Sequence, residues 1–193
     1  MAEPDLEAIP TWEDEYLDRV SDRLLHNYDL EKDVVVAGEP FDLAGEMRIE
    51  SEKHFFHSSL NYANHQAREF LYSRRQETIS VSELEALVST GHDIASDRVE
   101  HSDQHFSTDV TFAIVVPTYD DAVAQFVQSF ADRNLLRFGF HGHYEINLIV
   151  VAPEDRQLVH SQNVDVWKAF QTWEPIVDEE PSGWEKVRRY FTG

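Results

Sequence analysis

The sequence of 193 residues contains no cysteine and only four lysines. Without cysteine the chain has no disulfide bond, no thiolate zinc site and no cysteine nucleophile. Its seven glycines form no phosphate-cradling loop, and GxSxG, HExxH and EF-hand patterns are also missing. The longest apolar run, INLIVVA at 146–152, has the length of a buried strand and not of a membrane span. The first ten residues, MAEPDLEAIP, lack the features of a signal peptide, which predicts a cytoplasmic protein without a membrane segment.

Carboxylates dominate the charge of the chain. The sequence has 37 acidic and 16 basic residues, and its formal net charge is −21. Self-repulsion of this size destabilises a compact state at low salt, whereas molar salt shortens the Debye length to about 3 Å. The acids are spread through nearly every segment. This distribution favours a surface that holds solvent cations over an acidic protein that mimics or binds basic partners, because such a protein would more often concentrate its carboxylates in one segment. Basic doublets occur only at 74–75 and 188–189, so the composition disfavours nucleic acid as a partner.

High Asp and Glu, few Lys and no Cys are the features of proteins that work in a cytosol of molar salt. Together with the stretch GEMRIESEKHFFHSSLNYANHQAREFLYSRR at 45–75, they resemble a family of small cytosolic proteins from haloarchaea. The resemblance implies a cytoplasmic location at high salt. It implies no particular activity.

Hydrophobic periodicity predicts one domain over 1–193, with a flexible segment at 1–10 and a linker with a short helix at 174–193. The expected order is αββαα–loop–βαββ–α. This order predicts an α+β fold, in which helices pack on one face of a mostly antiparallel sheet of about five strands. A strand–helix–strand unit at 108–140 could add one parallel pair.

The individual elements follow from caps, spacing and turn residues. Residues 92–107 show no sustained period and are predicted to form a long loop after a helix that stops at Gly91. The stretch 135–151 is too long for one straight strand, so we expect a hairpin with a three-residue turn at 141–143, or a strand kinked at glycine. The other expected elements are helices at 11–27, 58–75, 80–91, 120–133, near 167–173 and near 184–191, and strands at 34–36, 41–50 and 110–117.

Ten histidines raise the question of a metal site, because zinc takes three or four His, Asp or Glu ligands at about 2.1 Å. In HFFHSSLNYANH at 54–65, a helix would separate His57 and His65 by about 12 Å, so one ion cannot bind both. His54 and His57 converge only if the chain turns between them. The pair His101 and His105 has helical ligand spacing but lies in a poor helix former.

The best-shaped histidine group is His141, His143 and Glu145. The three side chains share one face if the strand runs straight, whereas a hairpin would place both histidines in a turn that faces water. The candidate metal ligands are therefore His54, His57, His101, His105, His141 and His143.

The leading hypothesis is a binding or interaction module without catalysis or cofactor. It would use a polar sheet face and the 92–107 loop to bind a ligand or a partner, including a second copy of the chain. The residues assigned to this face are Glu46, Arg48, Arg137, His143 and Glu145. The alternative is a metal-dependent hydrolase, in which histidines and glutamates from separate segments hold a divalent metal such as zinc.

Overall fold

The computed structural model describes residues 10–51, 65–99, 105–136 and 142–175 of the chain. These ranges contain four helices and seven strands, which form one α+β domain. In chain order the elements are α1 (Glu15–Leu24), β1 (Asp29–Val36), β2 (Glu39–Ser51), β3 (His65–Arg75), α2 (Val81–Arg98), β4 (His105–Val115), α3 (Asp121–Ser129), β5 (Asp132–Leu135), β6 (His143–Ala152), β7 (Gln157–His160) and α4 (Trp167–Phe170).

The seven strands form one mixed sheet, in which six follow the order β1-β2-β3-β4-β6-β5 and β7 pairs with β6 off this path. β1, β2 and β3 pair antiparallel, whereas β3, β4 and β6 run parallel. β5 and β7 both pair antiparallel with β6, β5 along 143–146 and β7 along 149–152. The predicted fold class is confirmed, but the sheet has more strands than predicted and is mixed, and β7 was not predicted. α2 connects β3 to β4, so the predicted strand at 110–117, here part of β4, pairs in parallel with β3, a strand where the sequence predicted a helix.

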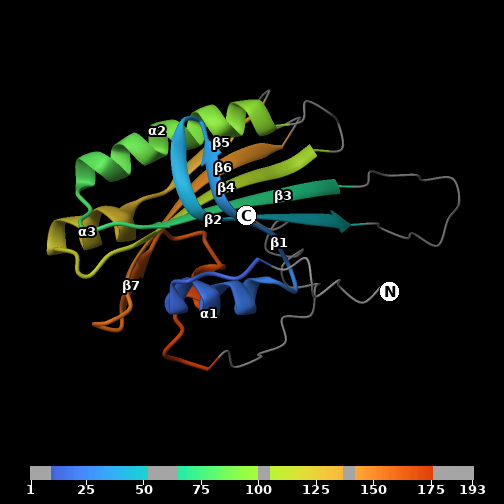
Figure 1. The fold of residues 1–193 in the computed structure, drawn as a ribbon. Helices are drawn as coiled ribbons and strands as arrows, with labels where there is room; N and C mark the ends of the chain where they lie inside the picture. The colour runs from blue at the N-terminus through green and yellow to red at the C-terminus, as the bar shows by residue number, and fades with distance from the viewer. Residues whose placement is uncertain (1–9, 52–64, 100–104, 137–141, 176–193) are drawn as a thin grey trace, which may run out of the picture.

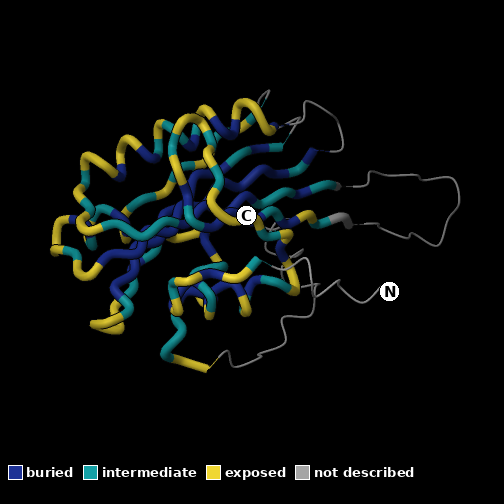
Figure 2. The backbone as a smooth tube through the Cα atoms, in the orientation of Figure 1, coloured by how far each residue is buried: buried dark blue, intermediate teal, exposed yellow. Residues whose placement is uncertain are grey.

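Helices cover both faces of the sheet (Figure 1). α2 and α3 pack on the face that carries Phe112 and Ile114, here called the α2/α3 face. α1 and α4 pack on the opposite face, which carries Ala113 and Val115 and is here called the α1/α4 face. Figure 2 shows β4 and β6 buried along nearly their whole length. The prediction of helices on one face was wrong, because strands that are apolar on both faces need cover on both.

Residues 65–75 form the strand β3, where the sequence predicted the end of a helix. Phe70 and Tyr72 belong to the core of the α2/α3 face, and Leu71 belongs to the core of the α1/α4 face. A strand that is covered on both faces loses the alternation of polar and apolar residues. Its apolar residues then imitate a helical stripe, which explains the wrong prediction.

α2 continues to Arg98 and includes residues 92–98 of the predicted 92–107 loop. Its predicted capping box is present, with Ser80 and Glu83 each accepting from the other's backbone N–H. Gly91 lies inside the helix and does not stop it, in contrast to the prediction. A Cβ at this position would come within 3.0 Å of side-chain atoms of Phe112 and Ile146. Glycine therefore serves the close approach of α2 to the sheet.

β5 and β6 form an antiparallel hairpin, as one of the two alternatives predicted, but its pairing differs from the expected one. Leu135 lies opposite His143, and the N–H of Leu136 donates to the carbonyl of Gly142 at 2.9 Å. Gly142 has a φ of +74°, and a Cβ there would overlap the carbonyl oxygen of Phe106. Only glycine fits this position. His143 consequently begins β6 as a buried residue and does not face water in a turn.

The two helices of the α1/α4 face differ in part from their predictions. α1 begins after Asp14 and not at Thr11, because the Asp14 carboxylate accepts hydrogen bonds from the N–H groups of Tyr16 and Leu17. The same carboxylate pairs with Arg75 at the end of β3, which ties the start of α1 to the sheet. α4 corresponds to the first helix predicted in the tail, and the second, near 184–191, lies outside the described residues.

Candidate functional site

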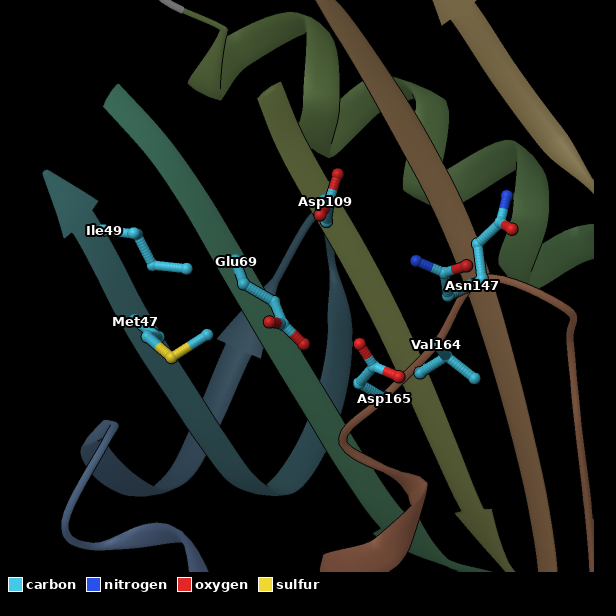
Figure 3. Close-up of a pocket in the computed structure, with 8 residues that line it drawn as sticks. Met47, Ile49, Glu69, Asp109, Asn147, Val164 and Asp165 are labelled. Carbon is cyan, nitrogen blue, oxygen red and sulfur yellow. The ribbon is translucent and has the colours of Figure 1, made fainter. Parts of the chain in front are cut away.

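A small pocket opens on the α1/α4 face of the sheet (Figure 3). Its residues come from β2, β3, β4 and β6 and from the segment between β7 and α4. Three carboxylates and two carboxamides lie together with three apolar side chains. We call this site the polar pocket, and its residues are Met47, Ile49, Glu69, Asp109, Asn147, Asn163, Val164 and Asp165.

The register of the parallel strands gathers these polar side chains. Glu69 lies opposite Asp109, and Asp109 lies opposite Glu145. Two residues along β4, Thr111 lies opposite Asn147. Because residues i and i+2 of a strand point to the same face, Thr111 shares the α1/α4 face with Asp109. The central strand therefore carries a row of polar side chains beneath the pocket.

The geometry of the carboxylates favours positive charge in the polar pocket. Figure 3 shows the carboxylates of Glu69 and Asp165 pointing toward one another from β3 and from the segment after β7. Carboxylates that face one another repel, and a positive group between them removes the repulsion. Asp109 is only 7% exposed, and reduced contact with water strengthens the attraction between its carboxylate and a cation.

The pocket is small and has an apolar wall. Its volume of about 20 Å³ is room for one group of the size of a water molecule. Met47, Ile49 and Val164 supply the apolar part of the lining. Among the described residues, no three His, Asp or Glu side chains are arranged to hold a metal ion. The pocket thus combines carboxylate acceptors with an apolar wall.

A buried hydroxyl group lies on the same face. Thr111 is fully buried, and within the described ranges its Oγ1 has no hydrogen-bond partner. A buried polar atom that lacks a partner costs about 1–3 kcal/mol, which a bound water molecule or a bound ligand offsets. This hydroxyl is an observation independent of the carboxylates, and it adds a second kind of buried polar group to the face that carries the pocket.

Asn163 connects the polar pocket to a cluster formed by Arg133, His143 and Glu145. The Arg133 Nε and the His143 Nε2 lie 3.4 Å and 3.5 Å from the Glu145 Oε1. Burial lowers the pKa of His143 to about 4, and the charges of Arg133 and His105 act in the same direction. Burial raises the pKa of Glu145, although Arg133 and a hydrogen bond to Asn163 oppose this rise. At neutral pH His143 is therefore uncharged.

The residues predicted to share one polar surface lie on opposite faces of the sheet. Glu46 is on the α2/α3 face, where it accepts hydrogen bonds from Arg48 at 2.8 Å and from Arg68 at 2.6 Å. Glu145 and His143 lie on the other face, next to the polar pocket. Strand register separates them, because Glu46 lies opposite Phe70 of the α2/α3 face, whereas the odd positions of β6, with Ile149 and Val151, face α1. Arg137 lies outside the described residues.

The predicted histidine ligands are only partly described. His105 and His143 are both buried, on the neighbouring strands β4 and β6, and the Nε2 of His105 lies 2.9 Å from the Thr108 hydroxyl. The structure does not describe the other four, so a metal site that includes them stays a prediction. These four are His54, His57, His101 and His141.

Sequence reasoning missed the residues of the polar pocket. The sequence predicted a helix at Glu69, and Asp165 lies in a segment without regular structure. Asp109 and Asn147 gave a usable signal, because each is a polar residue next to or within an apolar run of a strand. A polar side chain in a strand buried on both faces needs a partner. That rule alone points to both positions.

Comparison with known proteins places the chain in a family. No curated protein and no solved structure matches the chain significantly. In the part of the chain that the structure describes, every helix is too short or too polar to cross a bilayer. The model of one family, described as Domain of unknown function (DUF8052), matches residues 13–172. This match includes every element from α1 to α4, and the chain therefore belongs to that family.

Proposed function

We propose that the chain is a ligand-binding module and that its ligand places an alkylammonium group in the polar pocket. The carrying observation is that Glu69, Asp109 and Asp165 line one pocket that holds a single group of the size of water. A primary ammonium has three N–H donors and a full positive charge. It is therefore the cation that matches several carboxylate acceptors in so small a space.

The apolar wall supports an organic amine over an inorganic ion. Met47, Ile49 and Val164 offer a surface along which an alkyl chain can lie, as in most small-molecule sites. An inorganic ion would gain nothing from this wall. The arrangement of the carboxylates, which does not suit metal coordination among the described residues, supports the same choice.

Binding is expected to persist at high salt. Exposed ion pairs are largely screened at molar salt, whereas partly buried pairs are screened much less. Asp109 is buried, so its attraction for an ammonium group survives where surface carboxylates only collect solvent cations. Selectivity against the bulk cation is expected from the three N–H donors of the ammonium and from the apolar wall.

Calorimetric titration with cadaverine in molar KCl tests the proposal. We expect saturable binding of one cadaverine per chain, and no binding of the uncharged 1,5-pentanediol. Asp109→Asn keeps the shape of the side chain and removes its charge, and should weaken cadaverine binding at least about tenfold, which is 1.4 kcal/mol.

The matched control is Asp155→Asn, because Asp155 is an exposed carboxylate in the turn between β6 and β7. This variant should bind cadaverine like the unchanged chain. A chain that shows no saturable binding, or an Asp109→Asn variant that binds as tightly as the Asp155→Asn variant, refutes the proposal.

We also propose that the protein works in a cytosol of molar salt. A net charge of −21 with four lysines and no cysteine supports this environment, because high salt screens the self-repulsion of the acidic surface. The expected location is cytoplasmic, and the expected surface partners are solvent cations.

A further inference from the structure

Three titratable side chains lie in contact on the α2/α3 face, on the opposite side of the sheet from the polar pocket. The Nδ1 of His92 on α2 lies 3.1 Å from the hydroxyl of Tyr144 on β6. The Nε2 of the same imidazole lies 3.1 Å from the Oδ2 of Asp132 on β5. The rings of His92 and Tyr144 meet edge to face, with centroids 5.8 Å apart. A hydroxyl, an imidazole and a carboxylate are thus in line.

The fold holds the three groups in place from three directions. Asn134, which lies opposite Tyr144 in the hairpin, donates to the second carboxylate oxygen of Asp132. Gly91 lets α2 approach the sheet, and this approach brings the next residue, His92, within reach of β5 and β6. The constellation therefore depends on contacts among α2, β5 and β6 and not on one mobile side chain.

The two contacts of the imidazole indicate which atom carries each proton. The Asp132 carboxylate, 3.1 Å from the Nε2 of His92, favours a proton on that nitrogen, which leaves the Nδ1 as the acceptor for the Tyr144 O–H. Burial, and to a smaller extent the charge of Asp132, raise the pKa of Tyr144. The phenol therefore stays protonated at neutral pH, and it needs a base in order to attack an electrophile. His92 is within hydrogen-bond reach for that role.

The groups remain accessible to small molecules. The side chain of His92 is 37% exposed and that of Asp132 is 22% exposed. Tyr144 is half-buried. The partial exposure of all three side chains leaves the cluster open to a small electrophile.

We propose that Tyr144 is a nucleophile that His92 activates and that it accepts an acyl group from a reactive ester. The Tyr144 oxygen attacks the ester carbonyl while its proton passes to the His92 Nδ1, and Asp132 stabilises the imidazolium that forms. The leaving alcohol or phenol departs with that proton, and Tyr144 holds the acyl group as an aryl ester. Water then attacks this ester with His92 again as base, which releases the acid and restores Tyr144. Tyr144 and His92 act on the substrate, and Asp132 is a positioning residue.

The test is acylation by p-nitrophenyl acetate at neutral pH, followed by acid quenching and peptide mass spectrometry. Tyr119 is the internal reference, because it is also half-buried and burial also raises its pKa. We expect acetylation of Tyr144 to be at least about tenfold faster than that of Tyr119, since general bases supply about 10²–10⁴-fold. This comparison needs no variant, so it does not depend on the folding of a mutant.

Two variants separate activation from a merely structural contact. His92→Gln retains hydrogen-bonding groups but cannot act as the base, and it should reduce acetylation of Tyr144 to the rate of Tyr119. Asp132→Asn should reduce it in part, because the imidazole loses its orienting charge. Equal rates at Tyr144 and Tyr119 in the unchanged chain overturn the proposal. An unchanged rate at Tyr144 in the His92→Gln variant, with Tyr119 as reference, overturns it as well.

Discussion

Asp109, Thr111 and Asn147 are buried polar residues in strands whose other residues are largely apolar. Apolar residues of similar size would stabilise β4 and β6 more, because burial of polar groups costs free energy unless they find partners. Local rules of stability are most often broken at sites of function. The burial of these three residues therefore supports the proposal that this face of the sheet carries a binding site.

His143 makes the stability of the fold depend on pH. The pKa of His143 is about 4 in the folded chain, against 6.5 for an unperturbed histidine. Between these values the unfolded chain binds more protons, so the stability present above pH 6.5 is lost as the pH falls toward 4, by up to about 3 kcal/mol. Glu145, whose pKa is raised, has the opposite dependence and reduces the net slope.

Urea unfolding at pH 7 and pH 5, at constant molar KCl, checks this prediction. His143→Gln should lose less stability than the unchanged chain between these pH values. His26→Gln removes an exposed histidine and should leave the difference unchanged. Equal losses in the unchanged chain and in His143→Gln would show that His143 is not held uncharged by burial.

The candidate site could be predicted from the sequence only in part. Alternation along one strand was enough to group His143 with Glu145, but Glu69 and Asp109 of the polar pocket lie on other strands that are far away in the sequence. Which strands lie side by side follows from the topology of the whole sheet. No local feature of the sequence indicates the order of the strands. Without that order, the residues that lie beside β6 on the same face of the sheet could not be identified.

α2 covers the core of the sheet beside the cluster of His92, Asp132 and Tyr144. Its buried residues Leu84, Leu87, Ile94 and Ala95 pack on the α2/α3 face. Its glycine was a misleading signal, because glycine stops many helices. Packing against Phe112 and Ile146 is a tertiary contact, so sequence spacing alone could not distinguish a helix stop from a point of close approach.

Gly91→Val should destabilise the fold by about 1–3 kcal/mol, the usual cost of overpacking a core. The valine side chain would overlap Ile146 and Phe112, whose side-chain atoms lie 3.0 Å from the position that a Cβ would take at residue 91. Ser89→Val introduces the same side chain at an exposed position of α2 and should change stability by less than about 0.5 kcal/mol. Urea unfolding measures both; equal effects would mean that α2 does not depend on close approach at Gly91.

At the scale of the whole molecule, charge and fold impose separate conditions. Two apolar cores, one on each face of the sheet, supply the driving force for folding. The acidic surface opposes it through self-repulsion. The composition predicts that the fold needs high salt to screen this repulsion. It could not show that helices cover both faces of the sheet.

The free energy of unfolding should rise between low salt and molar KCl, as the Debye length falls from about 30 Å to about 3 Å. The dependence should be weaker in a variant with three exposed carboxylates neutralised, Glu77→Gln, Glu85→Gln and Asp97→Asn, since less repulsion remains to be screened. Unfolding in urea over a series of KCl concentrations measures both curves. Parallel curves, or stability that falls with KCl, contradict the electrostatic account.

NMR chemical-shift mapping with cadaverine in molar KCl tests whether the polar pocket binds an alkylammonium group. We expect saturable shifts at the backbone amides of Glu69, Asp109, Asn147 and Asp165, with one binding constant. We also expect these shifts to be lost in Asp109→Asn. Shifts that are spread over the acidic surface without saturation, or that saturate at residues away from the pocket, would contradict the proposal.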